Sequence, residues 1–174
     1  MGIFVDNVKN TLDPSSGIIV VLDNEQYRIH EGQHFFATDH DNDIDVETSK
    51  YWHVIAPDSS TDVHLKFTLH LDDPGKIEVF EAPTTTANGT SITVFNNDRN
   101  SANTADLTLY SDPTVSADGN LIYVERIGTN KSAGGKLRRN QEIILKYSAA
   151  YLIKVTTDAN DNEASIEFHW YEVS

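Results

Sequence analysis

The residues best suited to metal chemistry form an Asp-x-Asp-x-Asp motif at Asp39, Asp41 and Asp43. Closely spaced carboxylates chelate hard cations, and an EF-hand calcium loop begins with this spacing. The rest of that motif is missing, because its sixth position holds Ile44 instead of glycine and its twelfth holds Lys50 instead of glutamate. We therefore interpret residues 39–45 as a solvated acidic loop. Whether this loop binds calcium outside an EF-hand motif stays open.

The remaining reactive residues do not form a catalytic set. None of the seven histidines has the spacing of a zinc motif such as H-E-x-x-H, and Gly32 between His30 and His34 argues against their pairing on a helix. The absence of cysteine excludes thiol catalysis and cysteine-based zinc sites. There is no G-x-S-x-G nucleophile motif and no phosphate-binding loop. We expect no enzyme, with no catalytic residue, no metal ligand and no cofactor.

Some aromatic side chains could stack on a sugar, but aromatic residues on the apolar face of a strand are more often part of the core. Tyr171 falls on the opposite side of its strand and is the better surface candidate. The aromatic residues expected in the core are Trp52, Tyr151, Phe168 and Trp170.

The net charge of −14 opposes binding to nucleic acid or to an anionic membrane. The longest apolar run, residues 18–22, is too short to cross a bilayer. The charge is uneven, because residues 126–146 hold six cations and one anion (+5), which leaves −19 for the rest of the chain. A basic segment on an acidic body suggests contact with an acidic surface, such as another copy of the chain. A solvated loop is the alternative. The candidate contact residues are Arg126, Lys131, Lys136, Arg138 and Arg139.

The hydrophobic pattern predicts an all-β chain. Residues 63–71 and 166–170 alternate strictly between apolar and polar side chains, as strands with one buried face do. Short strands are also expected at 26–30 and 33–37. Together the strands favour an antiparallel β-sandwich or jelly roll with long polar loops. Residues 17–174 are expected to form this single domain. Residues 1–16 are expected to form an N-terminal arm or a first strand.

A duplicated segment lies in the middle of the chain, with residues 80–92 matching residues 110–122 at an offset of 30. Each copy contains an aromatic residue, a Pro-Thr pair, an Asn/Asp-Gly pair and an isoleucine. Proline suits a strand end, and Asn-Gly or Asp-Gly suits a tight turn. The pattern therefore predicts two related hairpin arms that project from the sandwich. Their key residues, Pro83, Gly89, Pro113 and Gly119, are candidate interface residues.

Eight short segments form an ordered set of motifs: Ile29–Gly32, Tyr51–Pro57, Asn96–Thr104, Asp112–Gly119, Ile127–Gly135, Ile144–Lys146, Tyr151–Thr156 and Phe168–Glu172. Their order and spacing resemble a family of virion proteins from tailed bacteriophages, some of which are head decoration (capsid cement) proteins. The loop at 96–104 departs from the family in having Asn97-Asp98 where a second Arg-Asn is usual, and Tyr147–Ala150 replaces a Pro-Asn-Thr turn. Residues 1–28 are not covered.

The resemblance implies a non-enzymatic protein that binds the outer surface of the capsid and stabilises it. Its partners would be the major capsid protein and itself, as a homotrimer that buries strand edges. It would be made in the host bacterial cytoplasm and reside on the virion. Arg99 would anchor the loop between the arms, unless it forms only a local salt bridge or loop cap. The alternative function is a phage adhesin or fibre-tip module that binds host-surface glycan.

Overall fold

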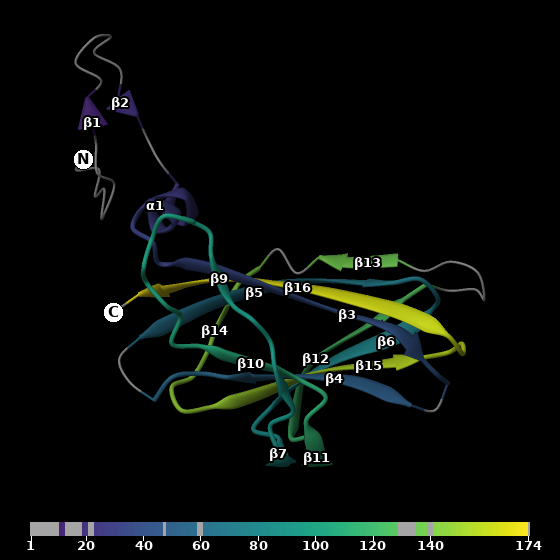
Figure 1. Cartoon of the computed structure of the whole chain (residues 1–174). Coiled ribbons are helices and arrows are strands. Elements are labelled where there is room, and N and C mark those ends of the chain that lie inside the picture. The colour runs from purple at the N-terminus through teal and green to yellow at the C-terminus, as the bar shows by residue number, and fades with distance from the viewer. Residues whose placement is uncertain are drawn as a thin grey trace, which may run out of the picture.

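In the computed structural model the chain forms two antiparallel sheets that pack face to face (Figure 1). The structure describes residues 11–12, 19–20, 23–46, 48–58, 61–128, 135–138 and 141–173. The two packed antiparallel sheets confirm the prediction of an all-β sandwich. A separate pair of short strands near the N-terminus, β1 (Thr11–Leu12) and β2 (Ile19–Val20), is also antiparallel. Residues 1–10 and 13–16 of the predicted arm lie outside the described residues.

Sheet I contains the strands that carry the duplication, in the order β12-β6-β15-β4-β10-β8. Its strands are β4 (Ser49–Ile55), β6 (Gly75–Glu81), β8 (Thr90–Ser91), β10 (Thr108–Ser111), β12 (Asn120–Ile127) and β15 (Ala150–Thr157).

Sheet II has the order β13-β5-β16-β3-β9, with β14 pairing with another part of β5. Its strands are β3 (His34–Ile44), β5 (Asp62–Leu71), β9 (Phe95–Asn96), β13 (Gly135–Arg138), β14 (Ile143–Ile144) and β16 (Asn162–Val173).

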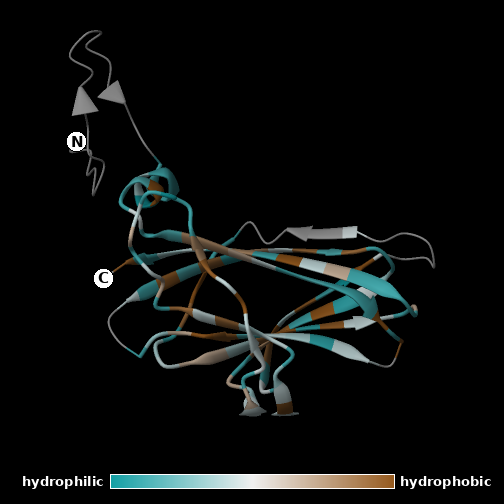
Figure 2. Cartoon of the chain, in the orientation of Figure 1, coloured by the Kyte–Doolittle hydropathy of each residue, from teal (hydrophilic) through white to brown (hydrophobic). Residues whose placement is uncertain are grey.

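The core lies between the two sheets and follows the predicted alternation. In β5 the odd-numbered residues from Val63 to Leu71 are all buried, whereas the even-numbered ones are not. Strand β16 pairs with β5 along its length and buries Ile166, Phe168 and Trp170 on the same face. Hydrophobic and hydrophilic segments accordingly alternate along the strands (Figure 2). The two strands with the clearest pattern are therefore central neighbours in the fold.

Helix α1 (Asn24–His30) replaces the strand predicted at residues 26–30, so that prediction is wrong. Asp23 caps the helix by accepting a hydrogen bond from the Gln26 amide at 2.8 Å. Gly32, at φ 68°, then turns the chain into β3. None of the helical residues is buried. The helix therefore lacks the apolar stripe by which a helix is recognised in a sequence.

The acidic segment expected as a loop is largely strand, because β3 continues to Ile44. Two of its carboxylates have partners on the neighbouring sheet. Asp39 accepts a hydrogen bond from the Trp52 indole at 2.8 Å, and Asp41 lies 3.1 Å from the Lys50 ammonium group. These contacts give both carboxylates polar partners, while the backbone of β3 keeps its hydrogen bonds to β16. The prediction of a solvated loop over residues 39–45 is therefore wrong for most of its length.

The duplication forms a pseudo-twofold arrangement within sheet I. The short arms β7 (Thr84–Ala87) and β11 (Thr114–Ala117) pair with each other, and Figure 1 places them on the side of sheet I opposite to sheet II. Equivalent residues make equivalent bonds, since the Ala82 amide bonds to Ala150 O at 2.9 Å and the Asp112 amide bonds to Tyr51 O at 3.0 Å. The two predicted arms are present, but the pairing is between the copies and not within each copy.

Candidate interface

The glycines of the two arms lie where the two repeats of the chain contact each other most closely. Gly89 and Gly119 adopt φ 96° and 95°, which side chains rarely tolerate. A Cβ atom on Gly89 would lie 2.1 Å from Ser111 O, and one on Gly119 would lie 2.5 Å from Glu81 O. Each glycine thus packs against the turn of the other repeat. Gly89 meets the backbone of Ser111–Pro113, and Gly119 meets the backbone of Glu81 and Ala82. The arms form one joint structure.

The joined arms cover a small second core on the outer face of sheet I. Phe80, Leu152 and His53 are successive cross-strand partners, and all three are buried although their neighbours in sequence face the main core. The main chain of Asn88, in the first arm, contacts the His53 ring, and burial lowers the pKa of His53. Lys154 fastens the second arm through a 2.8 Å bond to Asp118. The arms are therefore packed against sheet I.

Strand β12, which continues from the second arm, presents an apolar edge to solvent. Leu121 is 51% exposed, Ile122 46% and Val124 53%. The strand pairs with β6 along one side and ends the strand order of sheet I. A β-bulge at Ile122 breaks the alternation between its two faces. Among the described residues no strand pairs with the other side of β12, and an exposed apolar edge of this kind is suited to pairing with another chain.

Arg99 lies at a different corner, away from the arms. Its loop is held by Asn96, which donates to Gly32 O at 2.8 Å, and by Asn103, which donates to the same oxygen at 3.2 Å. The Arg99 guanidinium sits 5.0 Å from the centre of the Phe95 ring, which is 40% exposed. Such a cation–π contact holds Arg99 at the surface. The structure therefore groups the predicted arm residues together but places Arg99 elsewhere.

Part of the basic segment can be located. Arg126 pairs with Asp158, and Lys146 lies 2.6 Å from Glu81, so both cations have local acidic partners. Lys136 and Arg138 belong to β13 at the edge of sheet II. Lys131 and Arg139 lie outside the described residues.

Lys50 is a buried cation that links the two sheets and the second arm. Its Nζ atom lies 2.8 Å from Asp112, 2.9 Å from Ser111 Oγ and 3.1 Å from Asp41. Burial disfavours the ammonium ion, but the hydrogen bonds to Asp112 and Asp41 outweigh burial and raise the pKa of Lys50. A lysine held in its charged form is not a nucleophile or a base. We interpret this cluster as a structural clamp.

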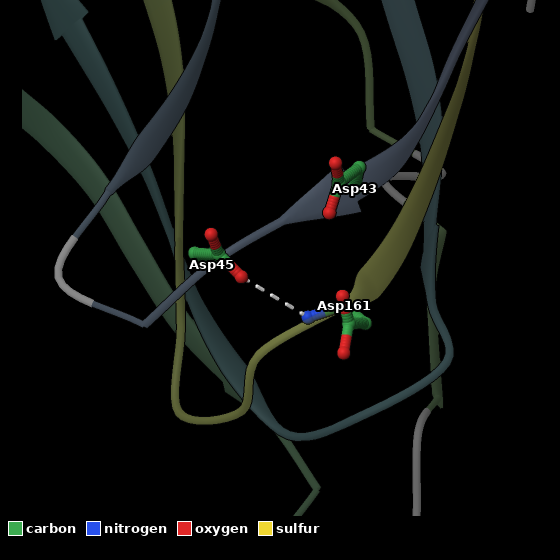
Figure 3. Close-up of side chains that lie close together, drawn as sticks. All are labelled: Asp43, Asp45 and Asp161. Carbon is green, nitrogen blue, oxygen red and sulfur yellow. Dashed lines mark hydrogen bonds between the residues drawn. The ribbon is translucent and has the colours of Figure 1, made fainter.

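Three exposed carboxylates are close enough to share a cation (Figure 3). Asp43, Asp45 and Asp161 bring oxygen atoms within 4.8 Å of one another, and the Asp161 amide donates to Asp45 at 3.4 Å. These residues could hold a hard cation such as calcium. Only part of the predicted Asp39–Asp45 cluster contributes, because Asp39 and Asp41 face Trp52 and Lys50 instead.

The aromatic side chains offer no sugar-stacking platform in the described part of the chain. Trp52 and Trp170 are completely or almost completely buried, and Tyr151 and Phe168 are also in the core, as predicted. Tyr171 was the expected surface residue, but it is only 6% exposed because α1 and Glu142 cover it. The exposed Trp and Tyr cluster that a glycan-binding protein would present is not found among these residues.

The burial of His34 is expected to make the stability of the folded chain depend on pH. The His34 ring is buried. Its Nε2 atom lies 3.3 Å from the Glu25 carboxylate, and its Nδ1 atom lies 2.6 Å from the side-chain amide nitrogen of Asn97. Burial lowers the pKa of His34, although Glu25 opposes the shift. His34 therefore binds a proton at a higher pH in the unfolded chain than in the folded chain. The contribution of neutral His34 to the free energy of unfolding is lost as the pH falls below about 6.5. In urea unfolding, the stability difference between wild type and His34→Gln should shrink between pH 7.5 and 5.5. A difference that does not change would contradict this assignment.

No helix in the described part of the chain is long and apolar enough to span a membrane. No family model matches the sequence, and no curated protein is significantly similar to it.

Proposed function

We propose that this protein is a non-enzymatic head decoration protein that binds the outer surface of a bacteriophage capsid and stabilises it. The partners in this proposal are the major capsid protein and further copies of the chain in a homotrimer. Assembly would follow synthesis in the host bacterial cytoplasm. The proposal is supported by the motif resemblance, the β-sandwich and the exposed apolar edge of β12.

The edge of β12 is the observation that carries the proposal. Soluble proteins usually protect edge strands with charges, prolines or a covering element. Here Leu121, Ile122 and Val124 are about half exposed on a strand of eight residues. Pairing of this edge with another polypeptide would supply backbone hydrogen bonds and bury the apolar side chains together. A protein that functions as part of an assembly has a use for such a surface.

The charge distribution supports contacts between copies. Residues 126–146, which begin within β12, carry +5 in sequence, whereas the rest of the chain carries −19. A contact between the basic segment of one copy and the acidic body of the next joins two different surfaces. Such head-to-tail contacts form a closed ring when the rotation between copies closes, and a trimer is one such ring.

Binding to purified expanded heads tests the function, and the pseudo-symmetry provides a matched control. Leu121 on β12 is equivalent to Ser91 on β8, and both are exposed. Leu121→Lys should weaken binding to heads by at least about tenfold, because a charge replaces a buried interface side chain. Ser91→Lys adds the same charge at the other edge and should bind like wild type. Sedimentation of heads with each labelled protein measures the difference.

Heads that bind no wild-type protein would refute the decoration function. Equal binding of wild type and Leu121→Lys would leave decoration possible but would exclude the β12 edge as the contact.

A further inference from the structure

Strand β12 leaves one long side of sheet I without a partner strand among the described residues. It ends the strand order of the sheet, and its one described partner is β6. The strand at the opposite end, β8, has two residues, whereas β12 has eight. Backbone groups along the free side of a strand can form a ladder with a further strand. The residues of β12 indicate which strand fits this edge best.

Regular pairing within β12 covers residues 123–127, of which all but Ile127 reach the surface. The bulge at Ile122 interrupts the alternation between the two faces before this stretch. Val124, in the middle of the surface part, is 53% exposed. On the opposite face, the Tyr123 hydroxyl donates to the Glu125 carboxylate. The stretch therefore presents an apolar side chain between a hydroxyl and a carboxylate.

A second copy of β12 fits this edge in one antiparallel register. A twofold axis perpendicular to the sheet aligns the faces of the two copies, so opposite residues share a face and the axis passes through a residue. An axis at Glu125 or Arg126 would place like charges opposite each other, which destabilises a sheet. An axis at Tyr123 would bring the bulge at Ile122 into the pair next to the axis. An axis at Val124 avoids both faults.

The central cross-strand pairs around Val124 are all favourable. Val124 lies opposite Val124 of the other copy, so each apolar side chain covers the other. Tyr123 lies opposite Glu125 of the other copy on both sides of the axis, so each carboxylate has a further hydroxyl donor within reach. These pairs use only the regular part of the strand, and none of them brings like charges together.

The charge at this edge allows two acidic copies to approach each other. The whole chain carries −14. Strand β13 of sheet II contacts β12 here, since a Cβ atom on Gly135 would lie 2.6 Å from Ile127. The charged residues of the two strands, with the carboxylate that pairs with β12, are three cations and two anions, which gives +1. Repulsion between copies is therefore weaker at this edge than between their acidic surfaces. The five residues are Glu125, Arg126, Lys136, Arg138 and Asp158.

We propose that the β12 edge pairs with β12 of a second copy around a twofold axis at Val124, which joins sheet I of the two copies into one continuous antiparallel sheet. This inference rests on the proposed function, because it names a partner for the edge that carries that function. The pair is isologous, whereas the contact between basic and acidic surfaces in the proposed trimer is head-to-tail, so one contact does not replace the other. Leu121 lies beyond the bulge, outside the central pairs, and stays available to the capsid.

Cysteine cross-linking tests the register, because the chain contains no cysteine of its own. Val124→Cys should form a covalent dimer when oxidised with copper phenanthroline, as measured on a non-reducing gel. The two Cα atoms at the axis would be about 4.5–5.5 Å apart, which is within the range of a disulfide. Leu121→Cys is the matched control, since Leu121 is 51% exposed and Val124 is 53% exposed. The two copies of residue 121 would lie about 20 Å apart along the strands, so Leu121→Cys should cross-link at least about tenfold more slowly.

A third variant, Ser91→Cys, lies exposed at the other edge of sheet I and reports the rate of random collision. It should cross-link as slowly as Leu121→Cys. Cross-linking of Leu121→Cys as fast as Val124→Cys, or no covalent dimer of Val124→Cys, would overturn the twofold pair. That failure would leave the binding of wild type to heads, which tests decoration, unaffected. Circular dichroism verifies that each variant is folded.

Discussion

Gly89→Val and Gly119→Val are each expected to reduce the free energy of unfolding by about 3 kcal/mol or more. At either glycine a side chain meets backbone atoms of the other arm, 2.1 Å away at Gly89 and 2.5 Å away at Gly119. Backbone cannot move aside as the end of a flexible side chain can, and the left-handed φ adds strain for a β-branched residue. The arms should then separate from each other.

The loss is expected to remain local to the arms. Hydrogen exchange should show β7 and β11 unprotected in both variants while β5 and β16 stay protected, because the main core lies on the other side of sheet I. Thr90→Val, next to Gly89 but exposed, is the control and should change stability by less than about 0.5 kcal/mol. Global unfolding of both glycine variants would mean that the arms belong to the main core.

Lys50→Met is expected to lower stability by about 3 kcal/mol at pH 7. The substitution keeps the length of the side chain but leaves Asp39, Asp41 and Asp112 without their shared cation. Removing one partner from a buried ion pair costs more than the pair contributed, because the remaining charges are partly desolvated. Lys76→Met is the control, because the Lys76 side chain that pairs with Glu78 is 43% exposed, and it should cost less than about 1 kcal/mol.

The pH dependence of the Lys50 effect has a definite sign. Burial raises the pKa of Asp41, but the Asp43 amide and Lys50 outweigh it, so the folded-state pKa is lowered. Its stabilising contribution is present above the unfolded value of 3.8 and is lost as the pH falls below it. The difference between wild type and Lys50→Met should therefore be constant from about pH 5 to 8 and smaller at pH 3. A difference that grows in acid would show that the carboxylates do not depend on Lys50.

The sequence revealed the sandwich where packing is simple. Strict alternation identified β5 and β16, since each buries one face only. It did not reveal α1, because that helix is held by polar contacts such as Glu25–Lys66 at 2.7 Å and has no buried residue. The offset of 30 residues identified the arms. Their mutual pairing could not be predicted, because nothing in a repeat says whether a strand pairs with its own copy or the other.

The candidate interface was predicted in part. Proline and glycine have restricted or unusual backbone conformations, so Pro83, Gly89, Pro113 and Gly119 were recognisable as turn residues. The β12 edge was missed, because a run such as Leu121–Val124 looks the same in a buried strand as in an exposed one. The Lys50 clamp was also missed, since its partners are distant in the sequence and meet only through the packing of the two sheets.

The copy number of this protein in purified virions tests the central proposal most directly. Band intensities on a stained gel, compared with the major capsid protein, would give the number of copies per particle. A decoration protein is predicted to be present in hundreds of copies. A few copies per virion would contradict decoration and would point to the tail or a fibre.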